Sequence, residues 1–250
     1  MSVDAYAHCG REKFLPVESL EAVMDAAAVS CAVLCQHLGQ FDNSYIAAQI
    51  ERRPDRFAGV ALVDHTQPDW RERLPAIASQ GFRGVRLTTM ALLECPELAG
   101  GAASRGLIPL IYAPEGIEPI VPLLLELARE QPQTPIVISH LGNPTVAEHG
   151  TAGDEVLLLA DARNVSVQLS GLGMFCPFPY TPLDGLIAGV IGAFGPERVL
   201  WGSNYPVCGE GAADYGRDLD LVAGGLARWG IEPAAATAIC DTTARRIWFE

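Results

Sequence analysis

The sequence predicts a (β/α)8 TIM barrel that forms one domain over residues 1–250. Eight short β-rich runs recur along the chain, and their starts lie 25 to 34 residues apart. Most of the intervals between them hold segments with the 3.6-residue period of an amphipathic helix. Alternating strands and helices are typical of parallel βαβ units, and eight units in about 250 residues match the usual size of this barrel. A doubly wound open sheet is the competing architecture, but no G-x-G-x-x-G motif follows the first run.

Each expected strand ends where apolar and β-branched residues give way to polar or turn residues. In chain order the strands are Ser2–His8, Cys31–His37, Phe57–Asp64, Phe82–Thr88, Leu107–Ala113, Pro135–His140, Asn164–Gly171 and Arg198–Asn204. The expected helices between them are Val17–Val29, Asn43–Arg53, Trp70–Gln80, Ile117–Glu130 and Asp218–Trp229. Two segments rich in Pro, Gly and aromatic residues follow the last two strands, and we expect both to be loops at the active face: Cys176–Thr181 and Tyr205–Gly216.

The composition excludes several classes of protein. With 17 Lys and Arg against 30 Asp and Glu, the net charge is −13, and no basic cluster offers a surface for nucleic acid or an anionic membrane. The longest apolar stretches, such as Gly185–Gly195, are shorter than the roughly 20 residues that span a bilayer. No signal-peptide pattern opens the chain, and the 7 cysteines are scattered. We therefore expect a cytoplasmic protein with reduced thiols.

Polar side chains gather at the predicted carboxyl ends of the strands, where TIM barrels hold their active sites. Strand alternation places Tyr6 and His8 on one face, pointing into the barrel. Asp4 shares that face by the same alternation, but its lower position in the strand favours a structural role. The histidines at predicted strand ends are His8, His37, His65 and His140, and the other polar or aromatic ends are Arg86, Thr88, Tyr112, Ser170, Asn204 and Tyr205.

Five motifs carry a resemblance to a known family: V-D-A-Y-A-H, G-F-R-G-V-R-L, V-I-S-H-L-G, V-Q-L-S-G and R-V-L-W-G-S-N-Y-P. In this order and spacing they resemble the amidohydrolase-related family, which includes zinc decarboxylases of the aminocarboxymuconate type and metal-independent lactonases of the pyrone-dicarboxylate type. Members typically bind metal through a His-x-His pair, two further histidines and an aspartate. The resemblance places these ligands at Tyr6, His8, Tyr112, His140 and Asn204, so that only His8 and His140 keep the ligand residue type.

Two imidazoles, two phenols and a carboxamide are a poor ligand set for zinc, so we expect no metal and no other cofactor. Hydrolysis then requires a side-chain base and protein donors for the developing oxyanion. His140 is the first candidate for the base, with His8 as the alternative, because imidazole titrates near pH 7. The hydroxyls of Tyr6 and Tyr112 and the amide of Asn204 are assigned to polarise a carbonyl group.

Arg86 is assigned to capture a carboxylate, because a guanidinium group suits bidentate binding of that group. The remaining substrate contacts are assigned to His37, Thr88, Ser170 and Tyr205. Structural alternatives stay open at this point: His37 and His65 could cap loops, Arg86 could pair with Asp64 or Glu115, and Asn204 could be a turn residue.

The predicted function is a metal-independent hydrolase that opens a lactone, ester or cyclic amide of a small carboxylated molecule. The substrate is expected to be small, anionic and carbonyl-bearing. An isomerase, cyclase or lyase could use the same acid and base groups without activating water. A catalytically inactive ligand-binding barrel is a further alternative, and a homodimer is left open.

Overall fold

Eight parallel strands form a barrel in the computed structural model, which describes residues 2–147, 150–224, 228–229 and 232–250. The strands are β1 (Ser2–Ala7), β2 (Val29–Cys35), β3 (Phe57–Leu62), β4 (Gly84–Thr88), β5 (Ile108–Tyr112), β6 (Ile136–Ile138), β9 (Val165–Ser170) and β10 (Val199–Gly202). They pair in this order, and Ala7 bridges to Tyr205 to bring β1 beside β10. The prediction of a (β/α)8 barrel is confirmed.

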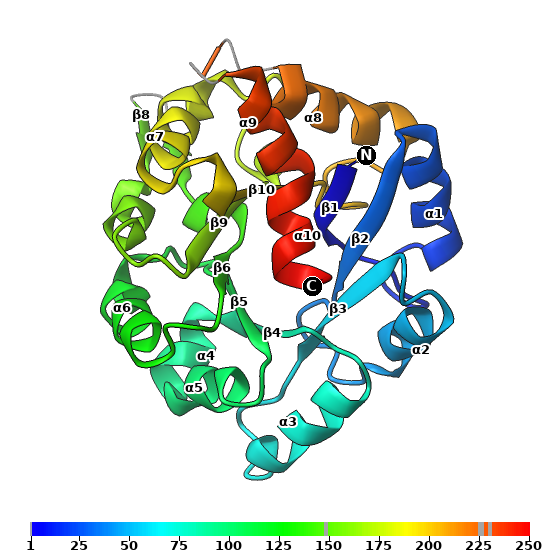
Figure 1. The fold of residues 1–250 in the computed structure, drawn as a ribbon, viewed down its shortest axis with the longest axis vertical. Coiled ribbons are helices and arrows are strands. Elements are labelled where there is room, and N and C mark those ends of the chain that lie inside the picture. Colours follow the sequence, from blue (N-terminus) through cyan, green and yellow to red (C-terminus); the bar gives the residue numbers. More distant parts are fainter. Residues whose placement is uncertain (1, 148–149, 225–227, 230–231) are drawn as a thin grey trace.

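Helices surround the strands, as Figure 1 shows. They are α1 (Val17–Ala26), α2 (Ser44–Arg52), α3 (Trp70–Ser79), α4 (Thr89–Glu94), α5 (Glu97–Ala103), α6 (Val121–Glu130), α7 (Asp184–Phe194), α8 (Ala212–Gly224), α9 (Pro233–Thr237) and α10 (Thr243–Trp248). After β6, a short antiparallel hairpin of β7 (Thr145–Ala147) and β8 (Gly150–Ala152) leads to the 3-10 helix Asp154–Leu159. Among the described helices, none is long and apolar enough to cross a bilayer.

One expected helix and one expected loop differ from the structure. The helix predicted at Asp218–Trp229 begins earlier, at Ala212, and positions 225–227 of the prediction lie outside the described residues. The segment Tyr205–Gly216 is therefore a loop only as far as α8. Its glycines favour a loop locally, but Tyr215 is buried against Trp201, and this packing holds the first turn of the helix on the barrel.

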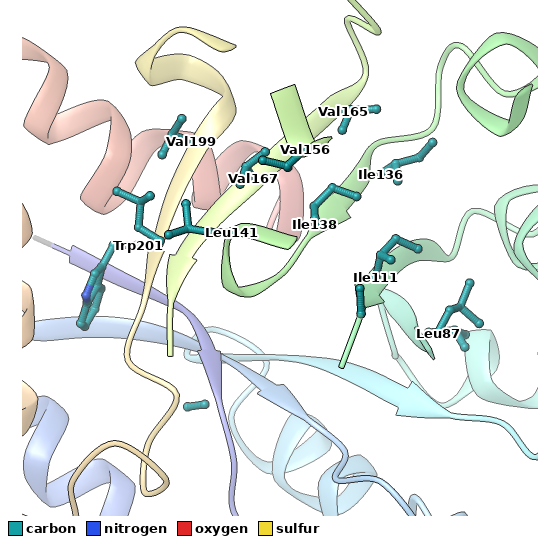
Figure 2. Close-up of a cluster of buried hydrophobic side chains, with 14 of the residues drawn as sticks. Leu87, Ile111, Ile136, Ile138, Leu141, Val156, Val165, Val167, Val199 and Trp201 are labelled. Carbon is teal, nitrogen blue, oxygen red and sulfur yellow. The ribbon is translucent and has the colours of Figure 1, made fainter. Parts of the chain in front are cut away.

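Apolar side chains fill both sides of the barrel wall. Outward-facing residues pack under the helices, and Figure 2 shows part of this layer, including Ile138, Val167 and Trp201. Inward-facing residues such as Val33, Val60, Leu110 and Leu200 form a second cluster with Ala244, Ile247 and Trp248 of α10. A Cβ at Gly84 would lie 3.0 Å from the Trp248 ring, so this glycine makes room for the tryptophan at the amino end of the strands. Helix α10 thus closes one end of the barrel (Figure 1), and the carboxyl ends of the strands form the mouth.

Candidate active site

The aromatic and imidazole rings predicted at the strand ends lie together at the mouth. The Tyr6 ring is central, with centroids 5.2 Å from the His8 ring and 4.5 Å from the His140 ring. The Tyr112 ring lies 5.5 Å from His140. The Arg86 Cζ atom lies 4.4 Å from the centroid of Tyr112 and 5.6 Å from that of Tyr6. Four elements distant in sequence therefore bring these five side chains into one site.

A bulge in β1 gives Tyr6 its direction. The pairing register of β1 with β2 shifts between Asp4 and Ala7, and Ala5 and Tyr6 both belong to the inward-facing cluster. The prediction that Asp4 shares the face of Tyr6 is wrong, because the bulge interrupts strict alternation and Asp4 contacts Tyr215 of α8 instead. A Cβ at Gly202 would lie 2.8 Å from Cβ of Tyr6, so Gly202 leaves the space that this arrangement needs.

The ring of His8 is held in one tautomer. Its Nδ1 lies 2.7 Å from the carbonyl oxygen of Cys35, which can only accept, so Nδ1 carries the proton and Nε2 keeps a lone pair. The ring also stacks on Phe14, with centroids 4.7 Å apart and an interplanar angle of 8°. Burial, together with the positive charge of Arg86, holds the pKa of His8 well below its ordinary value. His8 is therefore a neutral ring with a free basic nitrogen at pH 7.

His140 sits in a strained loop and is held by Ser170. The residue has φ 53°, and Leu141 and Asn143 have positive φ as well. The Oγ atom of Ser170 accepts the backbone N–H of His140 at 3.2 Å and lies 2.9 Å from its Nδ1. Because Oγ already accepts that N–H, its own proton is available to Nδ1, which leaves the imidazole proton on Nε2. Ser170, predicted to contact substrate, thus orients His140.

Burial lowers the pKa of His140 to about 3, and the charge of Arg86 acts in the same direction. The expectation that the imidazoles titrate near pH 7 therefore fails for both His8 and His140. The sequence places the histidines at the mouth, but it does not show how completely the mouth excludes water. At pH 7 the two rings can accept or donate hydrogen bonds as neutral groups, and Arg86 is the cation among them.

Arg86 is buried, and within the described part of the chain it forms no ion pair. Its Nη1 donates to the carbonyl oxygen of Gln36 at 3.0 Å, and its Nε has no partner among the described residues. The alternative pairing with Asp64 is not formed, because that carboxylate accepts hydrogen bonds from Thr66 and Gln67. Among the residues that the structure describes, this buried guanidinium contacts a carbonyl and two aromatic faces and has no counter-ion.

The remaining predicted residues lie around the site or outside it. Asn204, with φ 54°, directs Nδ2 towards Met174 Sδ at 3.2 Å and Cys208 Sγ at 3.7 Å. A Cβ at Gly171 would lie 2.7 Å from His140 Nδ1 and 3.2 Å from Asn204 Nδ2, so this glycine separates the two side chains. Sequence reasoning identified neither sulfur atom: Met174 is 30 residues from Asn204 in the chain, whereas Cys208 is only 4 residues away.

Thr88 and Tyr205, which were predicted to contact substrate, each have a partner within the protein. Thr88 caps α4 by accepting the backbone N–H of Ala91 at 3.1 Å, and Tyr205 packs against Tyr215 of α8. His37 is half-buried beside the site, where its Nδ1 donates to the carbonyl oxygen of Leu38 at 3.1 Å. Phe14, which touches both His37 and His8, was also missed by the sequence reasoning.

His65 lies apart from the site and pairs with Glu94 at 2.9 Å.

The residues at the mouth do not fit a divalent metal ion. In the described ranges no group of three or more His, Cys, Asp or Glu side chains is placed to hold one. Burial raises the pKa of Tyr6, so its phenol stays neutral, and the Arg86 guanidinium adds a positive charge beside the two imidazoles. The fixed positive charge of Arg86 repels a second cation, and the neutral groups beside it provide no negative charge to bind one.

A parallel barrel closed at one end and lined with polar groups at the other defines the chain as a TIM barrel of the enzyme type. The amidohydrolase family model matches residues 102–249. The chain belongs to the amidohydrolase family.

Named relatives support this assignment. L-fucono-1,5-lactonase from Burkholderia ambifaria is 25% identical over 232 residues, which cover 82% of this chain and 80% of that protein. 4-Sulfomuconolactone hydrolase from Rhizobium radiobacter is 27% identical over 232 residues, which cover 83% and 73%. A probable 2-pyrone-4,6-dicarboxylic acid hydrolase from Acinetobacter baumannii, solved with citric acid bound, shares the fold with a TM-score of 0.74, 18% identity and 98% coverage of each chain.

Proposed function

We propose that the protein is a metal-independent lactonase that opens a small carboxylated lactone, with related esters or cyclic amides as further substrates. The observation that carries this proposal is the buried guanidinium of Arg86, which has no counter-ion among the described residues and lies beside the phenol rings of Tyr6 and Tyr112. A substrate carboxylate supplies that counter-ion, and the free Nε edge of the guanidinium fork suits it. The two curated relatives described above are both lactone hydrolases by name, which supports the reaction class.

The two imidazoles take complementary roles in this mechanism. His8 has its lone pair on Nε2, because the Cys35 carbonyl fixes the proton on Nδ1. It accepts a proton from water as the water oxygen bonds to the lactone carbonyl carbon. His140, whose Nδ1 is occupied by Ser170, donates from Nε2 to the oxyanion together with the hydroxyl of Tyr6. A neutral imidazole can act as such a donor when its pKa is depressed.

Ring opening completes the reaction. The bond between the carbonyl carbon and the ring oxygen breaks, the ring oxygen takes the proton that His8 holds, and a hydroxy acid leaves. Tyr112, whose ring centroid lies 4.4 Å from the Arg86 Cζ atom, is assigned to donate to the substrate beside that guanidinium. Asn204 has no basic atom and cannot be the base. The tautomers of the two imidazoles assign the base to His8, whereas the sequence alone favoured His140.

Turnover of a panel of lactones tests the proposal. Carboxylated lactones are expected to be opened and neutral lactones of the same ring size to react at least about a hundredfold more slowly in kcat/KM, because the Arg86 contacts are lost. In 18O-labelled water the product carboxylate gains label. An unlabelled product would replace hydrolysis by the lyase or isomerase alternative, which uses the same base without water.

Metal analysis tests the second part of the proposal. Protein treated with chelator is expected to keep full activity. Stoichiometric metal that is needed for turnover would refute a metal-independent mechanism.

The proposed cellular setting is a reducing compartment. All seven cysteines are free thiols in the structure, and six of them are buried. Thiols in this state suit the cytoplasm better than an oxidising compartment.

A further inference from the structure

A buried carboxylate lies just behind the active site, on the outer side of the barrel wall. Asp4 has no exposed surface and accepts four hydrogen bonds. Oδ1 accepts the backbone N–H of Tyr6 at 3.1 Å and that of Ser203 at 2.9 Å. Oδ2 accepts the hydroxyl of Ser203 at 2.5 Å and that of Tyr215 at 2.9 Å. Each carboxylate oxygen therefore accepts two hydrogen bonds, which is typical of an ionised carboxyl group.

These contacts join three elements at the seam where the barrel closes. Ordinary ladder pairing between β1 and β10 is limited here to the bridge between Ala7 and Tyr205. Asp4 adds links from the β1 bulge to the end of β10 and to α8. The backbone N–H of Asn204 donates to the Tyr6 carbonyl at 2.8 Å, directly next to these links. The backbone of both Tyr6 and Asn204 is thus fixed within one residue of an Asp4 contact.

We propose that Asp4 is a positioning residue whose carboxylate locks the β1 bulge onto the end of β10 and so holds Tyr6 and Asn204 at the mouth. The bulge turns the Tyr6 ring inward, against His140 at 4.5 Å, while the Asp4 carboxylate points outward to α8. Asp4 touches neither the mouth nor the Arg86 contacts, so it acts through Tyr6. This inference rests on the proposed function for its effect on turnover, but the packing of Tyr6 can be measured without turnover.

The groups that face Asp4 are neutral, so its hydrogen bonds depend on its own protonation state. Tyr215 from α8 and Cys35 from β2 face it, and burial raises the pKa of both, so both are neutral. Arg56 and Tyr205 also act electrostatically on Tyr215. Burial raises the pKa of Asp4 to about 6, against four hydrogen bonds that lower it. Above pH 6 the carboxylate accepts all four donors, and a proton on Oδ2 reverses its hydrogen bond with the hydroxyl of Ser203 or Tyr215.

Two substitutions of Asp4 separate positioning from bulk stability. Asp4→Ala removes every contact, and kcat is expected to fall at least about tenfold, because small displacements of a catalytic group cost up to about a hundredfold. KM is expected to stay within about threefold, since Arg86 is untouched. Asp4→Asn is expected to restore most of kcat, because its Oδ1 still accepts both backbone N–H groups and its amide can donate to both hydroxyls. Val190→Ala, in the buried face of α7, is the control for lost stability.

The outcomes of the kinetic test are distinct. A kcat of Asp4→Ala within twofold of wild type would refute the inference, as would an equal kcat loss in Val190→Ala at the same melting temperature.

A measurement without substrate completes the test. The 15N resonances of the His140 imidazole report on the Tyr6 ring beside it, and Tyr6→Phe supplies the reference shift. Asp4→Ala is expected to move these resonances and Asp4→Asn to leave them near wild type. Unchanged resonances in folded Asp4→Ala would refute the positioning role. If the wild-type protein opens no lactone, the proposed function fails, while the resonances still decide whether Asp4 positions Tyr6.

Discussion

Replacement of Arg86 by Met tests the central contact of the proposed mechanism. Hydrogen bonds to a charged group contribute about 1.5–3 kcal/mol each. Because Nη1 is used by the Gln36 carbonyl, the Nε and Nη2 edge is left for two bonds to a carboxylate. Their loss amounts to about 3–6 kcal/mol, or a factor of about 10² to 10⁴ in kcat/KM. Turnover of a carboxylated lactone and of its neutral analogue, measured in parallel, should show the loss only for the carboxylated compound.

The same substitution has a predicted effect on stability that opposes its effect on activity. A buried cation without a counter-ion is costly, and the two phenol faces offset only part of that cost. Arg86→Met is therefore expected to unfold at the same temperature as wild type or a few degrees higher. Arg83→Met is the matched control, because Arg83 donates to the Trp248 carbonyl at the closed end of the barrel. Equal losses on both lactones, or a melting temperature lowered by more than about 5 °C, would refute the assignment of Arg86 to carboxylate binding.

Three further predictions concern the groups around Arg86. The folded pKa of His140 is about 3 against an ordinary 6.5, so unfolding takes up protons below pH 6.5 and stability falls by about 5 kcal/mol towards pH 3. The pKa of Asp4 is raised from 3.8 to about 6, so this group increases stability by about 3 kcal/mol as the pH falls between those values and opposes the effect of His140. Urea titrations at several pH values should show a net loss of stability towards pH 3. Gly202→Ala should lower kcat at least about tenfold, because the new Cβ lies 2.8 Å from that of Tyr6, and wild-type kcat in a folded variant would contradict this reading. Ser170→Ala should lower kcat about tenfold with little change in KM, whereas a change in KM alone would return Ser170 to substrate binding.

The barrel could be predicted from the sequence because its strands are short apolar runs at regular spacing. The strand β3, expected at Phe57–Asp64, is observed at Phe57–Leu62, and the other seven strands lie within a few residues of their predicted bounds. The start of α8 could not be predicted, because it depends on the burial of Tyr215 between distant elements. Local pattern indicates which residues form strands, but not which helix a distant aromatic residue anchors.

The convergence of the strand-end residues of the site was predictable, but its electrostatics were not. Strand ends converge in a parallel barrel, so His8, Arg86, Tyr112 and His140 could be placed at one mouth from the sequence alone. The tautomer of His8 depends on the Cys35 carbonyl of a neighbouring strand. The face of Asp4 depends on a bulge, which strict alternation does not show. Both features arise from backbone placement across strands, which carries no signature in residue type.

The fixed charge of Arg86 links substrate binding to the basicity of His8 in the proposed mechanism. In the free protein, burial and this charge together hold the pKa of His8 well below its ordinary value, so the ring is neutral but weakly basic. A carboxylate bound to Arg86 offsets that charge and so removes one cause of the lowered pKa. The pKa of His8 then rises towards the range in which a general base is most effective. A neutral substrate leaves the charge in place, so it loses both the contact and the stronger base. Selectivity for carboxylated substrates should therefore be larger in kcat/KM than the two hydrogen bonds alone provide.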